Sequence, residues 1–286
     1  MLVGAAYRRQ NAVLAAPLVL FLLALLGFPA VMSLIYAASK ADFETLMSPE
    51  FIGLANFSTV LTDPDFWQAA WFSTRFAVVT TLAECGLGLA LAVFLAPLIR
   101  HHGWMVAVLI APIMVAPAMM GLMYRLVLHE FVGPLPHYLY AIFGSAPSFL
   151  GVRNLFATVA VIEILQWTPF AFLLFLTAYN ALPGDLREAA AVDGTRPWRM
   201  FWKIEWPLLL PTVGIALFIR FIDGFRVFDN IYVLVGPGPG GVTTSMSIYI
   251  YEAFFRAGDI GRALAAALIL FGFAFAAVAL AQRWQR

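Results

Sequence analysis

Long apolar runs alternate with short polar segments along most of the chain. A membrane-spanning helix needs about 20 consecutive, mostly apolar residues. Six runs approach or exceed this length, at residues 14–36, 71–98, 104–128, 155–179, 208–235 and 263–281. The pattern predicts an all-α polytopic membrane protein with six transmembrane helices, built as one transmembrane domain over residues 1–286. The first run is longer than the apolar region of a typical signal peptide, so we expect an uncleaved first span.

Prolines inside the third and fourth runs bear on the continuity of the expected helices. Pro112 and Pro117 lie in the third run, and Pro169 lies in the fourth. Neighbouring helices can satisfy the backbone groups that a proline leaves unbonded inside a membrane protein. We therefore expect all three prolines to kink their helices rather than end them.

Composition supports the membrane class and excludes several others. Apolar residues make up 63% of the chain and charged residues only 12%, whereas soluble domains contain about 25% charged residues. The formal net charge of +1 argues against a nucleic-acid partner. A single cysteine, Cys85, allows no disulfide within the chain, and no Cys/His cluster indicates a metal site. His129 and His137, eight residues apart, are interpreted as interfacial.

The distribution of basic residues predicts the orientation of the spans, because cytoplasmic segments of membrane proteins are enriched in Lys and Arg. With the N-terminus inside, nine basic residues fall on inner segments: Arg8, Arg9, Arg100, Arg187, Arg196, Arg199, Lys203, Arg283 and Arg286. Outer segments hold four: Lys40, Arg153, Arg256 and Arg262. Both termini, and the loop at residues 182–207 between the fourth and fifth spans, are therefore expected in the cytoplasm.

That loop is the longest polar interruption in the second half of the chain, and it is itself patterned. Asp185 suits the N-cap of a short helix ending at Val192. Gly194 can then adopt the left-handed conformation that ends many helices. Thr195 with Pro197 can start a second short helix. Two short helices around a glycine predict a docking element for another protein.

The spacing inside this loop resembles the signature loop of ABC importer permeases, EAA-x3-G-x9-I-x-L-P. Glu188, Ala189 and Ala190 are followed at the family's spacing by Gly194, Ile204 and Pro207, with Trp206 in place of the usual leucine. The resemblance implies a coupling helix seated in a cleft of a cytoplasmic ATPase subunit. It implies an ATPase-coupling role for seven residues: Arg187, Glu188, Ala189, Ala190, Asp193, Gly194 and Arg199.

Three further stretches are similar to carbohydrate permeases of the maltose and sn-glycerol-3-phosphate type. They are F-I-G-L-A-N-F at residues 51–57, Phe228-Asp229-Asn230, and the Gly/Pro-rich loop at 236–241 followed by I-Y-I-Y-E-A-F-F at 248–255. The resemblance covers residues 51–270. It implies import of a carbohydrate, polyol or sugar derivative delivered by an extracytoplasmic binding protein, across a bacterial cytoplasmic (inner) membrane.

The same resemblance implies the partners of the chain. They are a second homologous permease, expected to be a different chain, two ATPase subunits, and the surrounding membrane lipid. The chain lacks the Gly-Lys-Ser/Thr ending of a phosphate-binding loop. We therefore expect a non-catalytic subunit without a cofactor of its own, with ATP and Mg bound by the ATPase subunits.

The fifth run carries charges at three-residue spacing: Arg220, Asp223, Arg226 and Asp229. Such spacing allows neighbouring pairs to form along one helix face. Charges inside a membrane segment normally face protein or a wet cavity, so this series is either an ion-pair ladder or a polar lining of the transport path. The other candidates for that lining are Glu163, Gln166, Trp167 and Asn230. For Trp167 alone, packing against lipid or another helix is the favoured role. For Glu163 the functional role is favoured, because an unpaired buried carboxylate needs a reason. Glu84 could instead pair with an arginine elsewhere.

An alternative function is a self-sufficient secondary transporter driven by an ion gradient. It would use carboxylates at Glu84, Glu163, Asp223 and Asp229 as coupling sites, and it predicts internal inverted repeats, which the sequence does not show. An intramembrane enzyme is disfavoured, because the four histidines fall in loops without catalytic spacing to Ser, Cys or Glu.

Overall fold

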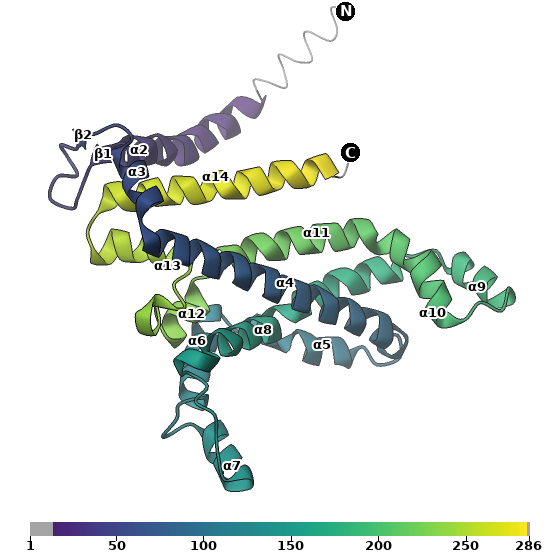
Figure 1. The fold of residues 1–286 in the computed structure, drawn as a ribbon. Coiled ribbons are helices and arrows are strands. Elements are labelled where there is room, and N and C mark those ends of the chain that lie inside the picture. The colour runs from purple at the N-terminus through teal and green to yellow at the C-terminus, as the bar shows by residue number, and fades with distance from the viewer. Residues whose placement is uncertain (1–13, 285–286) are drawn as a thin grey trace, which may run out of the picture. The chain divides into compact units, whose positions relative to one another are not determined.

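The computed structural model describes residues 14–284 and is predominantly helical (Figure 1). The chain divides into two compact units, Met1–Pro64 with Tyr249–Arg286, and Asp65–Ile248. The two units are described separately below. Of the basic residues that predicted the orientation, Arg8, Arg9 and Arg286 lie outside the described residues.

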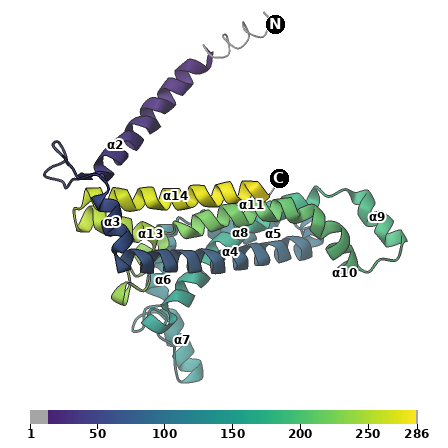
Figure 2. The ribbon, with the colours of Figure 1, turned by 45° about the horizontal axis from the view of Figure 1, so that its top comes forward.

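The first unit joins the N-terminal hairpin-like segment to the last helix. It begins with the helix Leu14–Ala37, which contains a π-helical turn at Leu23–Gly27 and ends with α2 (Phe28–Ala37). The other elements are β1 (Ser39–Lys40), β2 (Glu50–Phe51), α3 (Ala55–Thr62), a π-helical turn at Glu252–Arg256 and α14 (Ile260–Trp284). The strands β1 and β2 pair antiparallel, with Ser39 opposite Phe51. This strand pair was not expected in an all-α protein. Figures 1 and 2 both show α3 next to the start of α14.

Asn56 is the residue of the 51–57 stretch that organises this unit. Its side-chain amide is buried and donates hydrogen bonds to the carbonyl oxygens of Ala37 and Ser39, at 2.9 and 2.8 Å. Gly261 packs directly against the Ser39 carbonyl group. No larger residue fits there, because a Cβ on Gly261 would lie only 2.4 Å from the Ser39 carbonyl oxygen. Phe51 and Leu54 are exposed, as expected for side chains that face lipid or protein.

A second polar contact links α3 to α14. Tyr249, in α13 (Met246–Tyr251), donates a hydrogen bond of 2.6 Å to the Asp63 carboxylate, and Arg262 bonds both groups. Burial, reinforced by the hydrogen bond to Asp63, raises the pKa of Tyr249 to about 12. The phenol therefore stays protonated and remains a donor at physiological pH.

The second unit contains the remaining helices. They are α4 (Pro64–Ile99), α5 (Trp104–Ile110), α6 (Pro117–Val127), α7 (Pro134–Phe143), α8 (Val152–Asn180), α9 (Gly184–Val192), α10 (Pro197–Met200), α11 (Trp206–Phe225) and α12 (Asp229–Leu234). Short 3-10 turns at Ala111–Met114 and Pro239–Gly241 and a π-helical turn at Phe201–Glu205 complete it. The helix α8 continues through Pro169, so this proline does not end its helix, as expected.

The third apolar run does not form one kinked helix, so the expectation for its prolines was wrong. The segments Trp104–Met114 and Pro117–Val127 meet at an angle of 86° (Figure 1). Val115 and Ala116 between them have extended ψ angles of 129° and 139°. Pro117 lacks an N–H and forces the preceding residue out of the helical region, so the helix ends before it.

Four helices are long and apolar enough to cross a membrane: Leu14–Ala37, Pro64–Ile99, Val152–Asn180 and Pro197–Leu234. The bent pair at 104–127 counts as a fifth span if it crosses as one unit, and Ile260–Phe275 is a shorter apolar helix. Each of the six predicted runs thus corresponds to a helix or to the bent pair. The length and apolar character of these helices show a membrane protein.

Candidate functional site

A buried guanidinium lies where three long helices of the second unit meet. Arg220 on α11 is only 1% exposed. Its Nε bonds Glu84 Oε2 on α4 at 2.6 Å, and its Nη2 lies 3.4 Å from Glu163 Oε1 on α8. The approach of α11 to α4 is close, because a Cβ on Gly224 would lie 3.2 Å from the Ala77 Cα. One arginine therefore joins carboxylates from two other helices.

Further predicted residues gather around this centre. Trp167 lies under the Arg220 guanidinium, with its ring centroid 4.5 Å from Cζ. Asn230, in the first turn of α12, donates a hydrogen bond to Glu163. Asp223 lies 3.4 Å from Arg220 Nη1 and is 34% exposed, so the cluster reaches the surface of this unit on one side.

Two expectations about the carboxylates now have answers. Glu84 pairs with an arginine from another part of the chain, as the sequence allowed. Glu163 was favoured as a functional residue because it looked unpaired, and that reason was wrong: it is bound by both Arg220 and Asn230. Removing either partner from a buried pair of this kind leaves an uncompensated charge, which strongly destabilises a protein.

The predicted ladder of charges is present for two of its three steps. Arg220 pairs with Asp223, and Asp223 pairs with Arg226 at 3.0 Å. The helix α11 ends at Phe225, so Asp229 begins α12, and Arg226 and Asp229 form no ion pair among the described residues. Arg226 is 68% exposed, which makes this end of the ladder a surface feature.

Gln166 has a structural partner that its sequence position did not indicate. Its Nε2 donates a 2.9 Å hydrogen bond to the Val115 carbonyl oxygen, in the break between α5 and α6. Its Oε1 is buried and accepts no hydrogen bond from the described residues. The side chain therefore satisfies backbone that Pro117 exposes, and it joins α8 to the bent pair.

The polar cluster is enclosed along the helices by apolar packing. On α4, Glu84 lies between Phe76 and Ala92, which belong to two separate hydrophobic clusters. On α8, Glu163 lies next to Ile162 in the first cluster, and Phe172 further along belongs to the second. A charge cluster between two dry cores holds its helices in one register, because sliding a helix would move a charge into apolar surroundings.

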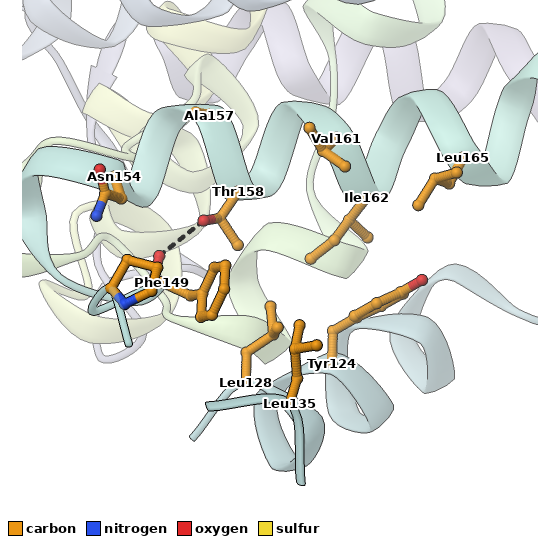
Figure 3. Close-up of a pocket in the computed structure, with 11 residues that line it drawn as sticks. Tyr124, Leu128, Leu135, Phe149, Asn154, Ala157, Thr158, Val161, Ile162 and Leu165 are labelled. Carbon is orange, nitrogen blue, oxygen red and sulfur yellow. Dashed lines mark hydrogen bonds between the residues drawn. The ribbon is translucent and has the colours of Figure 1, made fainter. Parts of the chain in front are cut away.

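An apolar cavity of about 440 Å³ lies between α6, α7 with the segment that follows it, and α8 (Figure 3). Thr158 on its wall donates a 2.7 Å hydrogen bond to the Phe149 carbonyl oxygen, and Asn154 bonds the Ser148 carbonyl oxygen. The side chains of Thr158 and Asn154 are therefore engaged with the backbone, and none of the eight residues predicted for the transport path lines the cavity.

The loop at residues 182–207 has the glycine-terminated helix that the sequence predicted. The helix α9 ends before Gly194, whose φ is +64°. The Thr195 N–H bonds the Ala190 carbonyl oxygen at 2.9 Å, as in a Schellman-type ending. The helix already begins at Gly184, so Asp185 lies in its first turn and is not the N-cap. Its charge still favours the helix N-terminus electrostatically.

The second half of the loop differs from the prediction of two separate short helices. The helix α10 continues through the π-helical turn Phe201–Glu205 into α11. Only α9 is a free-standing short helix. Its exposed surface includes Glu188, Ala189, Asp193 and Gly194, whereas Ala190 is buried.

The resemblance implied an ATPase-coupling role for Arg187, but its guanidinium is bound within the chain. Its Nε lies 2.7 Å from Glu205 Oε1, its Nη2 donates to the Tyr179 carbonyl oxygen at 3.3 Å, and its Cζ lies 4.1 Å from the Tyr179 ring centroid. Glu205 is only 2% exposed. Arg187 thus fastens α9 to the ends of α8 and α11. Glu205 is the one acidic residue in the basic stretch 196–207 of this loop, and it was the signal in the sequence for this contact.

We expect Glu205→Ala to loosen α9. Hydrogen bonds to charged groups contribute about 1.5–3 kcal/mol, so amide hydrogens at residues 184–192 should exchange about 10-fold faster or more, measured by mass spectrometry. Lys203→Ala, which removes an exposed charge from the same turn, is the control and should leave the exchange unchanged. Unchanged exchange in both variants would contradict a fastening role for the Arg187–Glu205 contact.

Comparison with known proteins places the whole chain in one family. A model of the binding-protein-dependent transport system inner membrane component matches residues 1–286. The chain belongs to this family. Among curated relatives, the trehalose/maltose transport system permease protein MalF of Thermococcus litoralis is 33% identical over 89% of this chain and 86% of its own length. The sn-glycerol-3-phosphate transport system permease protein UgpA of Agrobacterium fabrum is 30% identical over 90% and 88%.

The fold of this family member also matches a solved structure. A chain of a bacterial alginate ABC transporter, in complex with an alginate pentasaccharide-bound periplasmic protein, superimposes with a TM-score of 0.86. The match covers 100% of this chain and 97% of that one at 19% sequence identity. It shows that the two chains share a fold.

Proposed function

We propose that the chain is a membrane-spanning permease subunit of an ATP-driven importer for a carbohydrate or a related polyol or sugar derivative. The observation that carries this proposal is the family match over residues 1–286, whose description names a binding-protein-dependent transport system. Relatives that are at least 30% identical over most of both chains are named as sugar or glycerol-phosphate permeases, which supports the substrate class.

In this proposal the six apolar segments cross the membrane with both termini in the cytoplasm. An extracytoplasmic binding protein delivers the solute, and a second permease, expected to be a different chain, completes the path. Two ATPase subunits bind ATP and Mg, and this chain is non-catalytic. The exposed helix α9 with its rigid glycine ending supports a role for Glu188–Gly194 in contacting the ATPase, since it is a compact element that projects from the end of α8.

The geometry divides the candidates for the substrate path into two groups. Arg220, Glu163 and Asn230 are buried and form one bonded cluster with Glu84, which supports a scaffold role. Trp167, Asp223 and Arg226 are partly or fully exposed at the edge of that scaffold. An aromatic face beside a carboxylate and a guanidinium can stack on a sugar ring and bond its hydroxyl groups, so we place the solute contact at this edge.

The ion-coupled alternative gains little from the structure. It requires carboxylates that bind and release a cation, but Glu84 and Glu163 are already bound by Arg220. Purification of the chain in mild detergent from its native membrane tests the two functions. Co-purification of an ATPase and a second permease is expected. The isolated chain carrying out transport in liposomes without ATP would overturn the importer.

Trp167→Ala should change the preference among solutes. Aromatic contacts contribute about 0.5–1.5 kcal/mol, so KM for transported sugars should rise by up to about 10-fold and to different extents across a panel. Trp71→Ala, an exposed tryptophan on α4, is the matched control. Equal uptake of every sugar by wild type and Trp167→Ala would show that Trp167 does not contact the solute and only packs against Arg220.

A further inference from the structure

Aromatic side chains form a continuous row at the start of the long helix Pro197–Leu234. Trp198 and Trp202 lie in ring contact at 5.4 Å, and Trp202 and Trp206 at 5.4 Å. Trp198 is 70% and Trp202 is 44% exposed. Tryptophans in a soluble setting are usually buried, so a row of exposed indoles requires a partner surface.

Basic side chains accompany this row. Arg196, Arg199 and Lys203 are all exposed, and none of them forms an ion pair with a described residue. Arg199 and Lys203 are four residues apart, close to one helical turn. The acidic residue of this turn, Glu205, is buried against Arg187 and does not neutralise them. The exposed surface is therefore both aromatic and positively charged.

The position of this surface relative to the apolar part of the helix identifies a membrane interface. The continuous helical segment from Pro197 to Phe225 has 29 residues, or about 44 Å at 1.5 Å per residue, whereas the hydrocarbon layer is about 30 Å thick. The apolar run begins at residue 208, so Lys203 and Arg199 precede it by about 8 and 14 Å along the helix. Long basic side chains extend over such distances to reach lipid phosphates.

Charge also separates this surface from the neighbouring helix α9. The exposed charges of α9 include the acids Asp185 and Glu188, and Asp193 follows directly after it. An anionic membrane surface would repel these acids and attract the basic residues that follow Gly194. The distribution favours lipid at α10 and a different partner at α9.

We propose that Arg196, Trp198, Arg199, Trp202 and Lys203 form a binding surface for anionic phospholipid headgroups. The indoles lie at the level of the headgroups, where their apolar rings and polar N–H groups are both accommodated. Arg199 and Lys203 pair with the lipid phosphate, and the contact fixes the segment between α9 and α11 at the membrane surface. This inference requires only that the chain spans a membrane, and it is independent of the solute and of ATP.

Tryptophan quenching by brominated lipids tests the proposal. The complex, purified with its accompanying subunits, is placed in nanodiscs that contain increasing fractions of phosphatidylglycerol or phosphatidylcholine brominated near the headgroup. We expect stronger quenching by the brominated phosphatidylglycerol, and we expect the difference to disappear in Trp198→Phe/Trp202→Phe. Equal quenching by both lipids, or an unchanged difference in the double phenylalanine variant, would overturn the proposal.

A matched pair of charge variants locates the headgroup contact. A basic residue near an anionic surface strengthens lipid binding by about fivefold. In Arg199→Gln/Lys203→Gln, the mole fraction of brominated phosphatidylglycerol that gives half-maximal quenching should therefore rise by about fivefold or more. Lys40→Gln/Arg153→Gln removes two other exposed cations and should leave it unchanged. An equal shift in both variants would overturn the site. If brominated phosphatidylglycerol quenched these tryptophans only after the accompanying subunits had been removed, the surface would be covered by a protein partner in the complex, and the lipid proposal would be overturned.

Discussion

Replacing Arg220 with leucine should prevent most of the chain from accumulating in folded form. The guanidinium is buried and bonds Glu84 at 2.6 Å, with Glu163 at 3.4 Å. Removing one partner of a buried ion pair costs about 3–5 kcal/mol, a large part of the roughly 5–15 kcal/mol that stabilises a typical protein. Size-exclusion chromatography after a series of heating steps measures the loss.

Two further variants make this test specific to the buried cluster. Arg226→Leu also removes an arginine that pairs with Asp223, but Arg226 is 68% exposed, and surface pairs contribute about 0–1 kcal/mol. It should remain close to wild type. Adding Glu84→Gln and Glu163→Gln to Arg220→Leu removes the carboxylates left without a partner and should restore part of the stability. An Arg220→Leu protein as stable as Arg226→Leu would contradict the scaffold role.

The apolar runs located the long apolar helices of this protein, because helix length in a membrane is set by the thickness of the hydrocarbon layer. The outcome at the prolines was not predictable in the same way. Pro169 lies inside a continuous helix, whereas Pro117 starts a new one at a right angle. The difference depends on a tertiary contact, since Gln166 satisfies the Val115 carbonyl oxygen from another helix. No local pattern around Pro117 contains that information.

The charged cluster shows the same limit. Three-residue spacing predicted the contacts of Asp223 with Arg220 and Arg226, because neighbours on one helix follow from its geometry. The stronger partners of Arg220 lie 136 and 57 residues away along the chain, at Glu84 and Glu163. The cost of an unpaired charge in a membrane predicts that partners exist, and the fold decides which ones they are.

In the loop at residues 182–207, the local sequence predicted the backbone conformation better than the side-chain contacts. The left-handed conformation of Gly194 follows from the position of a glycine after a short helix, and the structure confirms it. The contacts of Arg187 could not be assigned in full from the loop alone, because Tyr179, one of its two partners, lies outside the loop at the end of α8. The role of the loop in contacting an ATPase stays a prediction.

Gly194→Val should uncouple transport from ATP hydrolysis while leaving the membrane helices folded. Gly194 has a φ of +64°, and no atom lies within 4 Å of the position of an added Cβ. The cost of a side chain is therefore backbone strain alone, about 1–2 kcal/mol for a left-handed residue and higher for a β-branched one. The strain shifts the end of α9, and we expect solute uptake to fall by about 10-fold or more.

Gly184→Val is the matched control for this experiment. Gly184 begins α9, it also has no atom within 4 Å of its Cβ position, and its φ is not in the left-handed region. Valine there adds the same side chain to the same helix without the strain, so uptake should remain within about twofold of wild type. Uptake and the ATPase activity stimulated by loaded binding protein are measured together in proteoliposomes. Equal losses in both variants would show that the loop tolerates no added side chain, and normal coupling in Gly194→Val would show that the conformation of its glycine is not required.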